Sequence, residues 1–280
     1  MNDPASPARR ILICADDYGM APGVSAAIRD LIARGRINAT SVMVLAPSFS
    51  AAEAEALDRA GGGRAEIGLH VTLTGPFQPM SAGFAPTRDG AFLPLAAMAA
   101  YALARWLDAE HLEREMVRQF AAFRAAFGRP PDFVDGHQHI HVFPQIRTTL
   151  IGVLKEAAPK AWLRQCGRSA AARKSLADPK GFILDALSRR LARLAAQNGV
   201  RTNPAFAGTY SFAPGADFTR LFPGFLGGLP DGGLVMCHPG KVDAELRRLD
   251  PVTDLRQSEY DYFLGDAFAQ ALAERGFSLA

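Results

Sequence analysis

The feature that most constrains the fold is an alternation between short apolar runs and longer amphipathic stretches. The runs have the length of buried strands, and the stretches between them have the length and apolar spacing of helices. The expected strands are residues 10–15, 40–45, 65–71, 133–135, 161–164, 233–237 and 277–279. The expected helices are residues 22–34, 49–60, 108–127, 145–157, 183–196 and 258–275. This order predicts an α/β fold of parallel strands joined by helical crossovers, either a βα barrel or an open sheet.

Two regions interrupt the alternation and are expected to be long loops or insertions. They are residues 74–107 and 166–180, which together hold Gly, Pro, Ser and Phe. The chain shows no internal repeat and no low-complexity linker, and its 280 residues suit one large α/β domain. We therefore predict a single domain over residues 1–280, with an insertion at about residues 75–106.

Composition and short motifs exclude several classes of function. Lys and Arg total 31 against 28 for Asp and Glu, an excess too small to indicate a nucleic-acid partner. The three cysteines form no CxxC pair, which argues against a disulfide framework and favours a reducing compartment. We find neither a glycine-rich phosphate loop nor a GxSxG serine elbow. The apolar run after the basic N-terminal segment is too short for a signal peptide, so we expect a cytoplasmic protein without a membrane span.

Histidines and aspartates gather at the carboxyl ends of the expected strands. These residues are Asp16, Asp17, His70, Asp135, His137 and His238. In a parallel sheet or a βα barrel, all the strands end on one face, and that face carries the active site. We therefore expect residues from distant parts of the chain to share one cleft.

The adjacent residues Asp16 and Asp17 allow two interpretations, one structural and one functional. Either carboxylate could be a turn former or a helix cap before Pro22. If both face one site, a divalent metal between them would relieve their repulsion and leave one as ligand and the other as base. Neighbours on a strand point in opposite directions, so sharing requires the backbone to turn after the strand, which Gly19 would permit.

The segment from His137 to His141 holds three of the six histidines of the chain, His137, His139 and His141. If it were extended, the three rings would face one side. Histidine nitrogens suit zinc, nickel, cobalt, manganese or iron, and an aspartate adds a hard oxygen. The alternative is an exposed histidine tract, which the apolar neighbours disfavour. His238 is either functional or structural.

Four segments together resemble the signature motifs of the YdjC-like carbohydrate deacetylases, a family that includes the chitooligosaccharide and hopanoid-biosynthesis-associated deacetylases. The segments are residues 15–19 (ADDYG), 68–74 (GLHVTLT), 134–144 (VDGHQHIHVFP) and 236–239 (MCHP). They follow the family order over residues 10–240. Tyr18 stands where Phe is usual, and Gly136 where Ser is frequent. Neither departure removes a charged or ligating group.

The resemblance implies a distorted (β/α) barrel that hydrolyses an N-acetyl group of an amino sugar. It also implies one divalent metal held by Asp17, His70 and His137, with Asp16 as the general base. By resemblance the metal is magnesium, although two histidines and one carboxylate favour zinc or another transition metal. His238 is our candidate for the acid that protonates the leaving amine, because it ends a strand on the same face.

The remaining polar and aromatic residues receive supporting roles. Asp135, His139 and His141 are expected to orient His137 or to touch the substrate. The insertion offers aromatic side chains that form either a sugar-stacking lip or a small satellite core. They are Phe77, Phe84, Phe92, Tyr101 and Trp106.

Two other functions remain open from the sequence. One is a different metal-dependent hydrolase on a βα barrel, acting on a phosphoester or a cyclic amide, with a binuclear site that uses the histidine tract. The other is a sugar-binding protein without catalysis, which would not need two adjacent carboxylates. The expected partner is an N-acetylated sugar, and the sequence leaves open whether the chain forms a homodimer.

Overall fold

A curled sheet of eight strands, paired in parallel throughout, forms the centre of the molecule. The computed structural model describes residues 8–169, 172, 179–213 and 215–280. The strand order is β7-β6-β3-β2-β1-β9-β8, and β10 pairs with the first half of β1. The strands are β1 (Arg9–Tyr18), β2 (Ala39–Val42), β3 (Glu66–Val71), β6 (Phe133–Gly136), β7 (Trp162–Leu163), β8 (Phe206–Ala207), β9 (Gly233–Cys237) and β10 (Phe277–Leu279).

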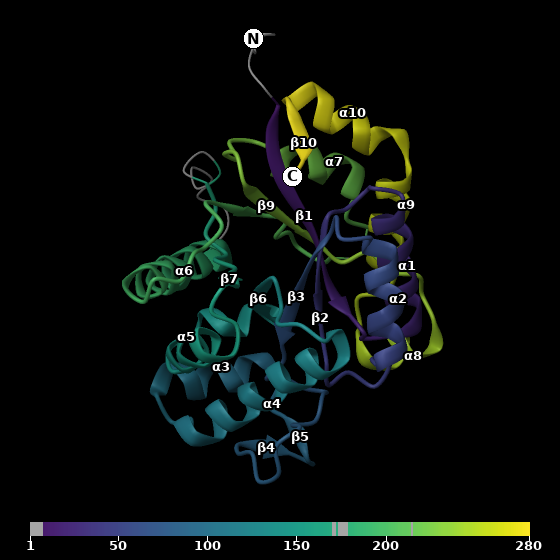
Figure 1. Cartoon of the computed structure of the whole chain (residues 1–280). Coiled ribbons are helices and arrows are strands. Elements are labelled where there is room, and N and C mark those ends of the chain that lie inside the picture. The colour runs from purple at the N-terminus through teal and green to yellow at the C-terminus, as the bar shows by residue number, and fades with distance from the viewer. Residues whose placement is uncertain (1–7, 170–171, 173–178, 214) are drawn as a thin grey trace.

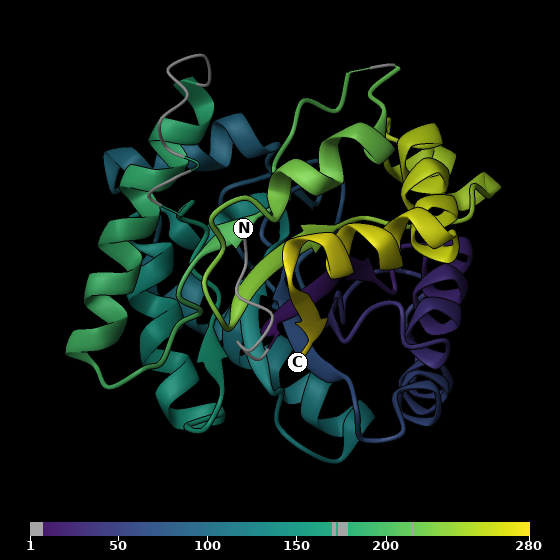
Figure 2. The ribbon, with the colours of Figure 1, turned by 90° about the horizontal axis from the view of Figure 1, so that it is seen from above.

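The two ends of the sheet approach each other. Leu163 at the end of β7 forms an isolated parallel bridge with Thr202, and Arg168 forms another with Phe206 in β8. Each bridge links one of these end strands to the segment next to the other, so the sheet curls into a distorted barrel, as Figure 2 shows from above. The prediction of a parallel α/β fold is confirmed, and the barrel is the better of its two forms.

Helices cover the outside of the curled sheet (Figure 1). The larger ones are α1 (Pro22–Ala33), α2 (Ala51–Gly61), α4 (Ala109–Phe127), α5 (Ile146–Ala157), α6 (Pro179–Gln197), α9 (Asp254–Leu264) and α10 (Asp266–Arg275). The shorter ones are α3 (Leu95–Ala104), the 3-10 helix η1 (His137–Val142), α7 (Phe218–Phe225) and α8 (Ala244–Leu249). Among the described residues, no helix combines the length and the apolar character needed to cross a bilayer.

Local sequence accounts for the main elements. β1 is buried on both faces along most of its length, which explains why residues 11–15 form an apolar run without alternation. The helix α4 begins where the Asp108 side chain accepts hydrogen bonds from the backbone of Glu110 and His111. It ends at Gly128, which adopts the left-handed conformation that glycine tolerates.

Several elements differ from the expectations. The region 74–107, expected to be a loop, contains α3 and a hairpin of β4 (Thr87–Arg88) and β5 (Ala91–Phe92). The sequence did not predict α3, because this Ala-rich helix has no clear amphipathic pattern. The expected helix 258–275 is two helices that meet at Gly265. The short elements β8, α7 and α8 were not expected. Much of the expected loop 166–180 lies outside the described residues, as do residues 1–7.

Candidate metal centre

Three side chains from three elements converge at the carboxyl edge of the sheet. Asp17 lies near the end of β1, His70 on β3 and His137 at the start of η1, and each offers one ligand atom within 4.8 Å of the other two. The Asp17 Oδ1 atom is 3.3 Å from His70 Nε2 and 2.9 Å from His137 Nδ1. The structure therefore brings together the three residues that the resemblance implied as ligands.

An irregularity in β1 allows the side chains of Asp16 and Asp17 to enter two neighbouring clusters of polar residues. The expectation that β1 ends before them is wrong, because the strand continues to Tyr18. The pairing of β1 with β2 shifts register between Ala15 and Tyr18, and Asp17 has a φ of 70°. This bulge, rather than a chain turn after the strand, directs both carboxylates toward the inside of the barrel at the carboxyl ends of its strands. We call this end of the barrel its mouth.

His70 is held by polar groups on its far nitrogen. Its Nδ1 atom lies 2.6 Å from Asp135 Oδ1 and 2.9 Å from Ser41 Oγ. Burial opposes protonation of His70, but Asp135 outweighs this effect and raises the pKa to about 10. A carboxylate behind a ligating histidine is a common arrangement at metal sites, and one carboxylate oxygen with two imidazole nitrogens suits a divalent cation. The residues present therefore fit the implied metal.

Asp17 is an ionised carboxylate in a buried position. Burial opposes its ionisation, but Arg256 and His137 hold its pKa well below the usual range. The Arg256 Nη2 atom donates to Asp17 Oδ2 at 2.6 Å. Asp17 therefore keeps its negative charge and directs its other oxygen, Oδ1, toward the two histidines.

Asp16 points into a second buried cluster that is organised by Arg164. The guanidinium donates to both oxygens of Asp16 at 2.7 Å, and it lies 2.6 Å from Asp135 Oδ2. Burial opposes ionisation of Asp16, yet Arg164 lowers its pKa below the usual range. Cys14, Asp16 and Asp135 have the spacing of a metal site, but the Arg164 guanidinium already binds all three side chains. This cluster therefore argues against a binuclear centre.

The histidine tract does not present three rings to one side. It forms a 3-10 helix in which Gln138 and His139 have positive φ angles of 53° and 57°, so the segment is not extended. His139 packs edge-on against Phe206, and His141 Nε2 donates to the carbonyl oxygen of Arg164 at 3.0 Å. Only His137 of the three belongs to the group with Asp17 and His70. Burial lowers the pKa of both His139 and His141 to about 3.

His238 directly follows β9, which pairs with β1. Its backbone N–H donates to Glu259 Oε2 at 2.5 Å, and the Tyr210 hydroxyl donates to the other oxygen of Glu259 at 2.7 Å. The Phe212 ring meets the His238 ring edge-on at 5.4 Å between centroids. Within the described residues, the buried Nδ1 atom of His238 has no hydrogen-bond partner.

The aromatic side chains of the insertion divide into two groups. Phe77, Phe84 and Phe92 are buried and belong to the main hydrophobic core, so they form neither a sugar-stacking lip nor a separate satellite core. Phe77 also packs edge-on against His137, with centroids 5.7 Å apart. Tyr101 is partly buried, and Trp106 is 74% exposed. Only the last two residues remain available for a lip.

Sequence reasoning did not find Arg164, Arg256 and Glu259. Arg164 ends the expected strand 161–164, and a charged residue at the end of an apolar strand was an available signal. Arg256 and Glu259 lie on α9 among other charged residues, and no local pattern distinguishes them from a solvated helix face.

Comparison with known proteins gives the family. A profile described as YdjC-like protein matches residues 10–274. The chain belongs to the YdjC-like family. Two relatives named chitooligosaccharide deacetylase are 27% identical (Serratia marcescens, 96% of each chain) and 26% identical (Escherichia fergusonii, 97% of each chain). A solved structure from Enterococcus faecalis, named for cellobiose-phosphate cleavage, superposes with a TM-score of 0.74 at 21% identity, over 98% of this chain and 97% of that one. This likeness shows a shared fold.

Proposed function

We propose that this YdjC-like protein is a carbohydrate deacetylase that uses one divalent cation to remove an N-acetyl group from an amino sugar. The observation that carries the proposal is the group of Asp17, His70 and His137 at the mouth of the barrel, with the ionised Asp16 beside it. The names of the two relatives over nearly the full length of the chain support the same reaction class.

Amide hydrolysis needs an activated water and a stabilised oxyanion. A divalent cation held by Asp17, His70 and His137 supplies Lewis acidity toward the acetyl carbonyl and toward water. Asp16 accepts the proton of the attacking water in this proposal. Each carboxylate oxygen has two lone pairs, so an oxygen that binds Arg164 retains one for the water proton. Arg164 keeps Asp16 ionised and fixes its orientation.

The leaving amine needs a proton, and His238 is the proposed donor. The residue follows β9, the neighbour of β1, so it lies on the same edge of the sheet as Asp16. Glu259 fixes the backbone at this position and leaves the imidazole ring free of that contact. Asp135 acts through His70, and His141 acts through the backbone of Arg164, so both support the centre from behind.

The identity of the metal is a separate part of the proposal. Magnesium is the first choice by family resemblance, whereas the two imidazole donors favour zinc or a similar transition metal. The three free, buried cysteines suit the reducing, cytoplasmic compartment that we propose.

Acetate release from a panel of N-acetylated sugars, with and without added magnesium, zinc, cobalt and manganese, tests the function. Asp16→Asn should retain the metal and lower turnover by roughly 10²-fold or more, because the amide cannot accept the proton. Asp17→Asn should instead weaken metal binding. If Asp16→Asn lost the metal while Asp17→Asn kept it, the two roles would be exchanged. No acetate release from any sugar with any metal would reject the deacetylase assignment.

A further inference from the structure

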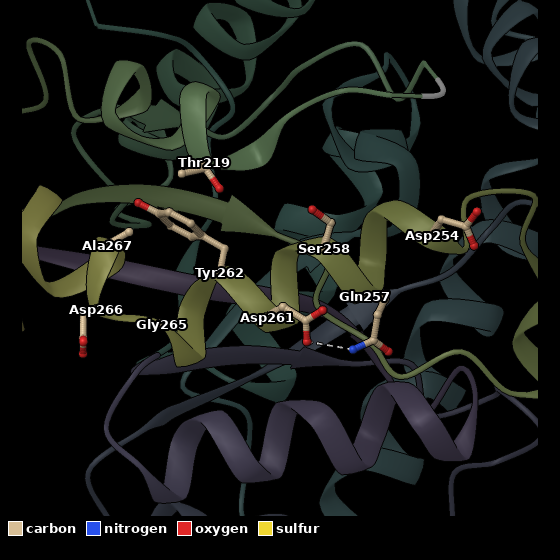
Figure 3. Close-up of a pocket in the computed structure, with 9 residues that line it drawn as sticks. All are labelled: Thr219, Asp254, Gln257, Ser258, Asp261, Tyr262, Gly265, Asp266 and Ala267. Atoms are coloured by element: carbon tan, nitrogen blue, oxygen red, sulfur yellow. Dashed lines mark hydrogen bonds between the residues drawn. The ribbon is translucent and has the colours of Figure 1, made fainter.

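Helix α9 has two faces with different surroundings. Figure 3 shows the outer face, where Asp254, Gln257, Ser258 and Asp261 line a surface pocket of about 530 Å³ that contains no residue of the metal centre. Arg256 and Glu259 are buried on the inner side. The inner face therefore brings two charged side chains to the barrel mouth from a point 239 residues away from Asp17 in sequence.

Arg256 binds one carboxylate oxygen of Asp17 and leaves the other oxygen facing the two histidines. Arg256 is 3% exposed, and its Nη2 atom donates to Asp17 Oδ2 at 2.6 Å. The other oxygen, Oδ1, faces His70 and His137. A carboxylate with both oxygens free can rotate and bind a cation through one or both of them. With Oδ2 held, Asp17 offers a single oxygen in one orientation.

Asp250 balances the charge of Arg256. Its Oδ2 atom accepts from Arg256 Nη2 at 2.6 Å and from Nε at 3.0 Å. Without this partner, a buried guanidinium beside Asp17 would cancel the charge of the ligand and repel a cation. The pair formed by Asp250 and Arg256 contributes hydrogen-bond geometry at Asp17 with little net charge.

We infer that Arg256 is a positioning residue that makes Asp17 a one-oxygen ligand and so increases the affinity of the centre for its cation, with Asp250 neutralising the guanidinium. The inference rests on the proposed metal-dependent function. It assigns α9 a part in metal binding, although this helix supplies no ligand itself. Groups behind a ligand commonly alter metal affinity by 10- to 100-fold.

The test measures metal binding directly, with no need for turnover. Zinc and cobalt dissociation constants are obtained by competition with a chromophoric chelator for the full-length protein and three variants. Arg256→Lys retains the charge but loses the planar fork, and we expect roughly 10-fold weaker binding. Arg256→Gln should weaken binding further. Asp250→Asn keeps the contact with Asp17 but unbalances the guanidinium, and it should also weaken binding.

Arg248→Gln is the matched control, because Arg248 is an exposed arginine on the nearby helix α8 that pairs only with Glu245 in the described structure. Its metal affinity should equal that of the unaltered protein. Unchanged affinity in folded Arg256→Lys and Asp250→Asn would overturn the inference and leave Arg256 a purely structural residue. If Arg256→Gln fails to fold, the metal affinities of Arg256→Lys and Asp250→Asn still test the inference. Failure of the proposed function looks different, because the unaltered protein itself would then bind no metal.

Discussion

Each of the two buried arginines at the candidate metal centre lies between two carboxylates. Asp16 and Asp135 surround Arg164, while Asp17 shares Arg256 with Asp250. Removing one partner of a buried ion pair leaves an uncompensated charge, which costs more than the pair contributes. The folded chain therefore depends on the same contacts that keep the carboxylates ionised.

Arg164→Met should destabilise the protein strongly, because Asp16 and Asp135 would remain buried without their cation. We expect a loss of about 3–5 kcal/mol in the free energy of unfolding, measured by urea denaturation. Adding Asp16→Asn and Asp135→Asn to the Met variant should recover part of this loss. A single Met variant as stable as the unaltered protein would show that the cluster contributes little.

His70→Ala and His137→Ala should each lose the bound ion, since two remaining ligands compete poorly with water and buffer. Elemental analysis of the purified variants measures the occupancy. His111→Ala is the control, because His111 lies on α4 outside the group of ligands. Full occupancy in both ligand variants would place the metal elsewhere.

The candidate ligands could be found from sequence because each stands at the end of an apolar strand within a recognisable motif. The supporting residues could not. Arg256 reaches Asp17 only through the fold, and its neighbours on α9 are charged whether they face water or the centre. The bulge at Asp17 was equally hidden, since register shifts depend on the partner strand.

At the scale of elements, η1 shows how a short motif misleads. Alternate histidines would face one side of an extended segment, but the positive φ angles of Gln138 and His139 turn the chain. The three rings therefore have different surroundings. The long elements were predictable, because β1, α1, α4 and β9 have clear apolar patterns and α4 has cap residues at both ends. Short strands such as β8 depend on pairing with a neighbour and carry no pattern of their own.

The buried histidines of η1 should make stability fall in acid. His141 has a pKa of about 3 in the folded chain, because burial disfavours its charged form, while an unfolded histidine titrates near 6.5. The stabilising contribution is therefore present above pH 6.5 and is lost as the pH falls toward 3. Between pH 7 and pH 5 this amounts to about 2 kcal/mol for one such histidine.

Urea denaturation at the two pH values measures this loss. His141→Asn can still donate a hydrogen bond but does not titrate, so its stability should fall less over the same interval. The comparison uses the difference between the two pH values, so a general loss of stability in the variant does not affect it. An equal fall in the free energy of unfolding of both proteins would show that His141 does not cause the loss of stability in acid.

At the scale of the whole molecule, the insertion is built into the barrel. Its buried phenylalanines belong to the main core, and Glu115 of α4 accepts hydrogen bonds from the backbone of Met80 and Ser81. Replacing residues 82–100 by a Gly/Ser linker should therefore destabilise the protein, because Phe84 and Phe92 would leave the core. A deletion cannot separate a role in substrate choice from a role in folding, so a single exposed residue must be used.

Trp106 is suited to that test. It is 74% exposed, and the next residue, Leu107, exchanges two backbone hydrogen bonds with the Gln145 side chain at 3.1 and 2.8 Å. Gln145 follows η1 closely, so the end of the insertion is fastened to the element that carries His137. An exposed indole held near the carboxyl edge of a barrel can stack on the face of a sugar ring.

Trp106→Ala should therefore raise KM for an N-acetylated oligosaccharide several-fold, while kcat and the metal content stay unchanged. Steady-state acetate release and elemental analysis measure these quantities. Val117→Ala on α4 is the control for loss of an exposed apolar side chain, and its KM should not move. An unchanged KM for Trp106→Ala, with a shift in oligomeric state by size-exclusion chromatography, would instead make Trp106 part of a contact between subunits.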